Sequence, residues 1–178
     1  MPGGTTRLAG PEAVTFAAAP AVAGRRIAGL LIPWDTTPAD GRRLTFRRGS
    51  VAEPQPWPLR VAHDSAAPAM PIGLAGVTCA VEDRADGLHL AATVPETTAG
   101  DDALELLRLG VIGGLSAEVA IRQVDEAADP PAVTAADLLA AALVPVPAFA
   151  AAAEVEVYER GGGPDLRRRR LRVAAALA

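Results

Sequence analysis

The 178-residue chain is short of several residue types on which common functional sites are built. Its single cysteine, Cys79, excludes an intramolecular disulfide and any metal site made of several cysteines. Two histidines exclude a histidine-rich metal centre, and no acid-rich motif is typical of calcium or magnesium binding. No glycine-rich loop has the dinucleotide or P-loop pattern. We therefore expect neither a metal nor a cofactor.

Aromatic residues make up only 3% of the chain, and all 17 basic residues are arginine. Half of the residues are apolar, so the core must come largely from alanine, valine, leucine and isoleucine. No run approaches the roughly 18 apolar residues of a membrane helix. The N-terminus also lacks the basic and apolar regions of a signal peptide. We expect a soluble protein made in a reducing compartment, with no membrane partner.

Composition divides the chain into three parts. Residues 1–23 are rich in glycine, proline, alanine and threonine, and we expect a flexible leader. Residues 24–158 hold alternating apolar segments and are long enough for one domain with its own core. Residues 159–178 form a glycine-hinged tail with six arginines. This tail is either a disordered, solvated end or an arm that orders as a helix on an acidic partner.

The local patterns predict a mostly β domain with one or two helices. Residues 27–32 read as a strand, and alternating runs on either side of Asp86-Gly87 predict a tight hairpin. Residues 101–109 read as a short helix, with acids at the start and leucines on one face. Residues 134–143 are ambiguous, because alanine and leucine favour a helix whereas an apolar run of this length also suits a buried strand.

One strand-like run carries polar residues on alternate positions. In "GGLSAEVAI", residues 113–121, Ser116 and Glu118 alternate with Leu115 and Ala117, so the two sets point to opposite faces of a sheet. A serine on a strand is ordinarily a satisfied or solvated hydroxyl. The alternative is a nucleophile, which needs a nearby base because a serine hydroxyl is otherwise unreactive.

The chain offers few partners for such a serine. His63 ends an expected strand just before a loop rich in proline and alanine, a suitable place for a working side chain. His89 lies within the expected hairpin, and we expect it to be solvated or bonded on the outer face and non-catalytic. Cys79 lies in an apolar strand, and we expect a buried core thiol rather than a nucleophile.

Five short motifs follow one another over residues 25–158. They are "LTFRRGSV" with Phe46 and Gly49; "LRVAHD" with His63, followed by Ile72-Gly73; "DGLHLAATVPETTAGDDALELLRLG"; "VIGGLSAEV" with Ser116; and "ADLLAAALVPVPAF". In this order and spacing they resemble the elements of the prohead (procapsid) maturation proteases of tailed phages, which are related to the herpesvirus assemblins.

The resemblance implies a fold and a site. The fold is mainly β with a few helices, a small assemblin-like β-barrel, and it makes residues 138–144 a strand. Ser116 is implied as the nucleophile and His63 as the general base. The family usually has a glutamate in the late strand as the third triad member, but Ala140 falls at that position. The third member is therefore missing or supplied from elsewhere.

The implied function is a serine endopeptidase that cleaves scaffold and capsid proteins during phage prohead maturation. Its partners are the major capsid protein with its scaffolding segment and the protease itself, through autocleavage or as a homo-oligomer. We expect no nucleic-acid partner, and we place the protein inside the assembling prohead in the bacterial cytoplasm. The alternative, raised by Ala140, is a weakened or inactive capsid-assembly protein of the same fold, acting as a scaffold or binding module.

Overall fold

The structure is a computed structural model of the chain. It describes side chains over residues 25–38, 42–62 and 70–146. It also describes four further strands by their backbone pairing, within residues 13–23, 154–159 and 167–172. The described part is mainly strands with one helix, which confirms the predicted mainly-β class.

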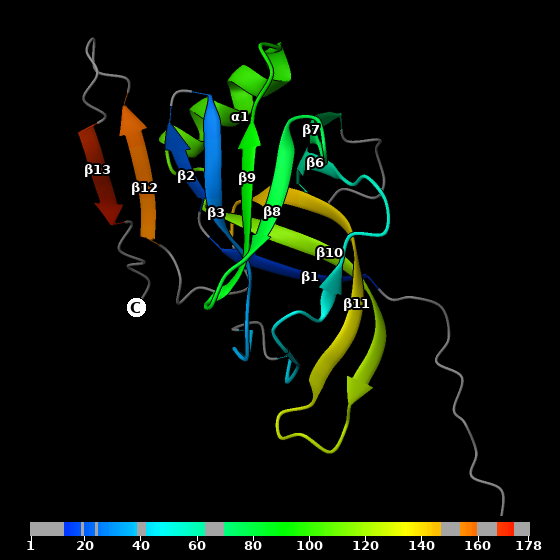
Figure 1. Cartoon of the computed structure of the whole chain (residues 1–178). Coiled ribbons are helices and arrows are strands. Elements are labelled where there is room, and N and C mark those ends of the chain that lie inside the picture. Colours follow the sequence, from blue (N-terminus) through cyan, green and yellow to red (C-terminus); the bar gives the residue numbers. More distant parts are fainter. Residues whose placement is uncertain are drawn as a thin grey trace, which may run out of the picture.

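The strands form two sheets, in which the described strands are joined edge to edge (Figure 1). The first sheet has the order β1-β10-β11-β6-β7, and β4 and β5 also pair with β11. Its strands are β1 (Ala13–Ala18), β10 (Gly114–Asp125), β11 (Ala132–Val144), β6 (Pro58–Val61), β7 (Pro71–Leu74), β4 (Thr45–Phe46) and β5 (Val51–Ala52).

The second sheet has the order β13-β12-β2-β3-β9-β8. Its strands are β13 (Arg167–Arg172), β12 (Glu154–Glu159), β2 (Pro20–Ala23), β3 (Arg26–Pro33), β9 (Gly87–Thr93) and β8 (Cys79–Asp83). Figure 1 shows these strands upright, with β1, β10 and β11 running across them. Neither sheet closes on itself among the described strands, so the predicted barrel is not confirmed.

The main core contains side chains from both sheets and from the helix. Leu31 of β3, Leu90 of β9, Leu115 of β10 and Leu138 of β11 are all buried in it. Aliphatic residues make up most of this core, as the composition predicted, because the chain has so few aromatic residues. The exceptions are the three buried rings of Trp34, Phe46 and Trp57 and the thiol of Cys79.

The helix α1 (Thr98–Arg108) confirms the helix predicted for residues 101–109 and begins three residues earlier. Thr97 caps it, since its side chain accepts a hydrogen bond from the backbone N–H of Gly100. Beyond the last turn, Gly110 has a φ of +72°, a left-handed conformation that suits glycine. The buried Leu104 and Leu107 hold the helix on the core.

The hairpin predicted around Asp86-Gly87 is confirmed as β8–β9. Its glycine is required by space, because a Cβ on Gly87 would lie 2.5 Å from the carbonyl oxygen of Ile32 on the neighbouring strand. The ambiguous run is confirmed as the strand β11. Pairing with β10 on one side and with β4, β5 and β6 on the other outweighs the helix propensity of its alanines and leucines.

The two ends of the chain also contribute strands. β1 and β2 lie within residues 1–23, where we expected a leader, and they pair with β10 and β3. Residues 167–172 of the expected tail pair with β12, which is neither the disordered end nor the helix considered for them. The three-part division of the chain stays a prediction. No helix among the described residues has the length and apolar character needed to cross a membrane.

Cys79 is buried in the core, as predicted. Burial raises the pKa of its thiol, although a side-chain hydrogen bond with Thr78 acts in the opposite direction. Alkylation requires the thiolate, so we expect native Cys79 to react with iodoacetamide about tenfold more slowly per unit of raised pKa, and burial slows it further. Mass spectrometry at pH 8, with and without guanidinium, measures this. Equal rates in both states would contradict it.

Candidate active site

Ser116 lies on β10, at an inner position of the first sheet. Its cross-strand neighbours are Ala17 of β1 and Ala142 of β11. The side chain has no exposed surface, and its Oγ has no hydrogen-bond partner among the residues that the structure describes. Leaving a buried hydroxyl without a hydrogen bond costs about 1–3 kcal/mol of folding free energy. A serine that only filled space would therefore be unfavourable at this position.

The lack of a partner does not by itself single out Ser116. The hydroxyls of Ser50 and Thr134 are also buried without a partner in the described part of the chain. What distinguishes Ser116 is its surroundings. Leu115 and Ala117 point into the main core, which confirms the predicted alternation and places Ser116 on the opposite face of the sheet.

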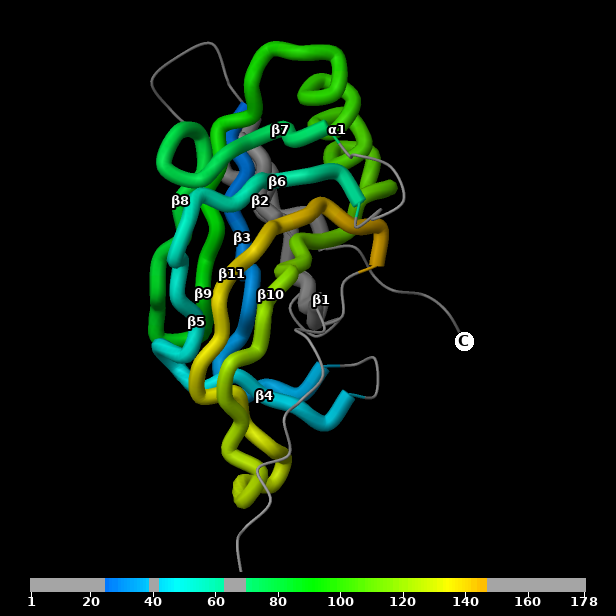
Figure 2. The backbone as a smooth tube through the Cα atoms, turned by 90° about the vertical axis from the view of Figure 1, so that its right-hand side faces the viewer, coloured from blue at the N-terminus to red at the C-terminus, as the bar shows by residue number. Residues whose placement is uncertain are grey.

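That opposite face carries a pair of charged side chains from two strands. Ser116 pairs with Ala142, which in turn pairs with Arg60 of β6, so the three residues form one row across the sheet. Glu118 lies two residues beyond Ser116 and therefore faces the same way. The Nη1 of Arg60 is 4.0 Å from the Oε2 of Glu118, and this ion pair spans β11. Figure 2 shows β6, β11 and β10 side by side.

His63, the predicted base, lies outside the described residues, so its distance from Ser116 stays a prediction. The described chain stops one residue earlier, at Ala62. The backbone N–H of Ala62 donates to the carbonyl oxygen of Leu143, 2.9 Å away, and Leu143 pairs with Leu115, the residue before Ser116. The strand β6 thus runs toward His63 with only β11 between it and the serine strand.

His89 is on β9 in the other sheet, and its Nε2 is 2.9 Å from Oδ1 of Asp86. This confirms the predicted position on the outer face of the hairpin. Desolvation acts to raise the pKa of Asp86, but the hydrogen bond to His89, a backbone hydrogen bond and the charges of His89 and Arg84 together lower it. The ring of His89 is therefore already bonded to the exposed carboxylate of Asp86.

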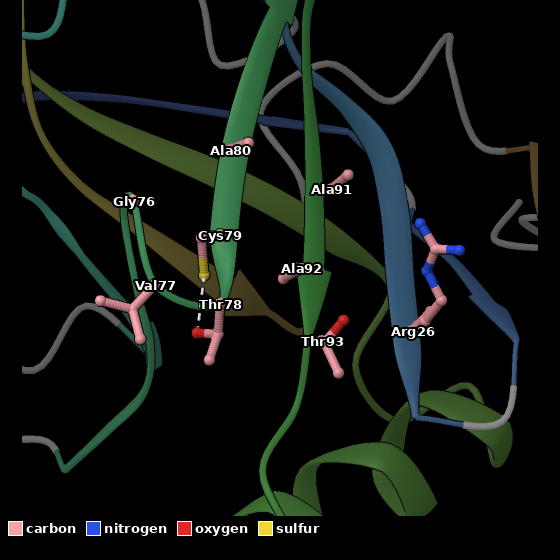
Figure 3. A pocket seen from close by; sticks show the side chains of 9 residues that line it. All are labelled: Arg26, Gly76, Val77, Thr78, Cys79, Ala80, Ala91, Ala92 and Thr93. Carbon is pink, nitrogen blue, oxygen red and sulfur yellow. Dashed lines mark hydrogen bonds between the residues drawn. The ribbon is translucent and has the colours of Figure 1, made fainter.

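A shallow pocket of about 360 Å³ lies elsewhere, against the second sheet (Figure 3). In Figure 3 the sulfur of Cys79 is directed at the hydroxyl of Thr78, and Arg26 lies on β3, which is separated from the Cys79 strand β8 by β9. The pocket has no residue from β10 or β11 and no histidine or serine. It offers no nucleophile–base pair. Within the described residues, no group of three potential metal ligands is found.

The structure also adds residues that the sequence analysis did not assign. Arg60 was not singled out, and Glu118 was noted only for its place in the alternating pattern. The signal for Arg60 was present, because period-two alternation in "LRVAH" places it on one face with Ala62. That this face would meet Ser116 depends on the parallel pairing of β6 with β11, which no local pattern specifies.

Two strand-rich layers around one core, with a buried serine hydroxyl on the same sheet face as an arginine–glutamate pair, define a mainly-β protein with a candidate serine-hydrolase site. The chain belongs to the caudovirus prohead serine protease family, whose family model matches residues 49–162. This match contains His63, Ser116 and Ala140. No curated protein and no solved structure matches the chain. Family membership confirms the predicted family and supports serine-type proteolysis in phage capsid maturation.

Proposed function

We propose that this protein is the endopeptidase of a phage prohead, with Ser116 as the nucleophile and His63 as the general base. Its substrates are the scaffolding segment of the major capsid protein and the protease itself, inside the assembling prohead in the bacterial cytoplasm. The observation that carries the proposal is the Ser116 hydroxyl. It lies within the family match, is buried without a described partner, and shares its sheet face with a charged pair.

The chemistry follows from these roles. His63 takes the proton of Ser116 Oγ as the oxygen attacks the scissile carbonyl carbon and forms the tetrahedral intermediate. The C–N bond then breaks, and the histidine gives that proton to the leaving amine. Water, deprotonated by the same histidine, then attacks the acyl carbon. The ester bond to Oγ breaks, the acid product leaves, and the histidine returns the proton to Ser116 Oγ. No metal and no cofactor takes part in this proposal.

Ser116 has no exposed surface in this arrangement. A scissile peptide therefore reaches the hydroxyl only after the site opens. This requirement suits a protease directed at a few partners within a closed assembly, because a permanently open serine would also cleave other host and phage proteins.

The test is incubation of the purified protein with the major capsid protein of the same phage, beside a Ser116→Ala variant. We expect the wild type to shorten the capsid protein and the variant to leave it intact. Gel electrophoresis and mass spectrometry detect the cleaved product. Ser50→Ala is the matched control, because it also removes a buried hydroxyl without a described partner, and it should leave cleavage unchanged. Identical products from wild type and Ser116→Ala would overturn the proposal.

A second candidate function is a non-catalytic capsid-assembly protein of the same fold. One specific observation favours it: Ala140, with no ionisable side chain, stands where the family usually has the third triad residue. If neither wild type nor variant cleaves while the protein still co-assembles with capsid protein, this second function is the better account.

A further inference from the structure

We propose that the outer face of the second sheet carries a groove that binds an extended peptide segment of a protein partner, with Arg26 binding one acidic side chain of that segment. The groove is the pocket of about 360 Å³ in Figure 3 together with an adjoining one of about 170 Å³. The two share Ala80 and Ala91. Neither contains Ser116, so the inference is independent of the proposed proteolysis.

The shape of the groove follows from the register of β3, β9 and β8. Residues two apart on a strand share a face, so the outward side chains form rows across the three strands. The middle row consists of Ala28, Ala91 and Ala80, which are all exposed. The rows on either side of it carry longer side chains, which are Arg26 and Thr93 in one row and Leu30, His89 and Glu82 in the other.

These dimensions suit a peptide chain. Rows on one face are about 7 Å apart, so the two flanking rows leave a trough about 13 Å wide with methyl groups along its floor. Three neighbouring strands span about 10 Å, which is the length of three extended residues. At one side of the larger pocket stands Val77, which is 75% exposed, and Arg26 stands at the other (Figure 3). The groove therefore offers apolar contact along its floor and a charge at one end.

Charge selects the acidic residue of the peptide. Arg26 is exposed and has no ion pair or side-chain hydrogen bond with any residue whose side chain the structure describes. The other charged groups that line the groove are already bonded, because Arg84 donates to Glu82 and His89 is bonded to Asp86. One unpaired cation matches one carboxylate. A nucleic acid fits less well, since the exposed Glu82 and Asp86 repel further phosphates.

Thr93 supplies a second polar group at the charged end. It is paired directly with Arg26, so their Cβ atoms are about 5 Å apart. A guanidinium binds a carboxylate through two parallel hydrogen bonds, and the threonine hydroxyl can donate a third. The hydroxyl of Thr78 is already used, because it accepts from the N–H of Leu74, 3.0 Å away. The carboxylate is thus bound over β3 and β9, and its small neighbours in the peptide lie on the alanine row.

The experiment is a titration of the isotope-labelled full chain, followed by the NMR signals of its backbone amides. The probe is the capped peptide acetyl-Ala-Ala-Glu-Ala-Ala-amide. The comparisons are the same peptide with glutamine in place of glutamate, and acetate alone. We expect saturable shifts centred on Arg26, Ala80 and Ala91. The glutamine peptide should bind about fivefold more weakly, the factor that an exposed ion pair can supply, and acetate should also bind more weakly because it does not contact the alanine row.

Two variants and a matched control locate the contacts. Arg26→Gln should weaken binding of the glutamate peptide about fivefold, and high salt should weaken it in the wild type, because salt screens an exposed pair. Ala91→Val raises the floor of the groove and should weaken the peptide while leaving acetate unchanged. Arg48→Gln is the control, since it removes an exposed arginine that is bonded to Asp83 and does not line the groove. It should bind like the wild type.

Circular dichroism checks that each variant is folded, and Ala91→Val tests the groove on its own if Arg26→Gln fails to fold. Equal binding of the glutamate and glutamine peptides, or unchanged binding by Arg26→Gln, would overturn the inference. Acetate binding as tightly as the peptide would reduce the groove to a simple anion site and overturn it too, as would shifts confined to other parts of the chain. Ser116→Ala should bind the peptide like the wild type, so failure of the groove and failure of the proposed protease are separate results.

Discussion

Replacing His63 with alanine should cost as much activity as replacing Ser116, and replacing both should cost no more than either alone. In the proposed mechanism the two side chains share one proton transfer, so once one is missing the other has nothing left to contribute. We expect the cleavage rate to fall about 10⁴- to 10⁶-fold, the range found when a member of a catalytic triad is removed. Quantitative cleavage of the capsid protein by the three variants measures this.

The matched control is His89→Ala. His89 is the other histidine of the chain, and it is bonded to Asp86 on the second sheet. This variant should cleave at the wild-type rate. Losses that add up in the double variant, or a His63→Ala variant that remains active, would show that His63 is not the base for Ser116.

The largest effect on stability is expected at Trp57. The ring has no exposed surface, and its Nε1–H donates to Oε2 of Glu53, 2.7 Å away. Its backbone carbonyl also accepts from the N–H of Ala75. Trp57→Ala leaves a large cavity, and such truncations cost about 3–5 kcal/mol of unfolding free energy. This is a large share of the roughly 5–15 kcal/mol by which a domain is stable.

Urea unfolding followed by circular dichroism measures the change at Trp57. Trp57→Phe should lose less than Trp57→Ala, because it keeps most of the buried ring volume. Met70→Ala is the control for a large apolar side chain that is 70% exposed, and it should shift the unfolding free energy by no more than about 0.5 kcal/mol. A Trp57→Ala variant as stable as the Met70→Ala variant would contradict the expectation.

Features set by neighbouring residues could be predicted from the sequence. The β8–β9 hairpin follows from the alternation on either side of Asp86-Gly87, and the helix follows from its acidic start and its leucine face. That Ser116 and Leu115 lie on opposite faces of the sheet could be predicted from the two-residue period of a strand alone. For β11, propensity alone favoured a helix, and the order of motifs decided correctly for the strand.

Features set by residues far apart could not be predicted in this way. The opposition of Glu118 and Ala140 depends on the register of β10 against β11, and a bulge changes that register directly after Glu118. The closure expected of a barrel was inferred from the family alone, and it is not confirmed, because neither sheet closes on itself among the described strands. The place of Arg60 in one row with Ser116 depends on the parallel pairing of β6 with β11, which no local pattern in the sequence of β6 specifies.

The parallel pairing of β6 with β11 also has a consequence for synthesis of the protein. Val61 is made early, but its partner Leu143 leaves the ribosome only after most of the domain has been translated. Contacts between such distant residues form slowly, because a long loop must close first. The side chains around Ser116 therefore come together among the last steps of biogenesis. A nascent or truncated chain that ends before β11 lacks these neighbours of Ser116, so under the proposed function it should be inactive until translation of the domain is nearly complete.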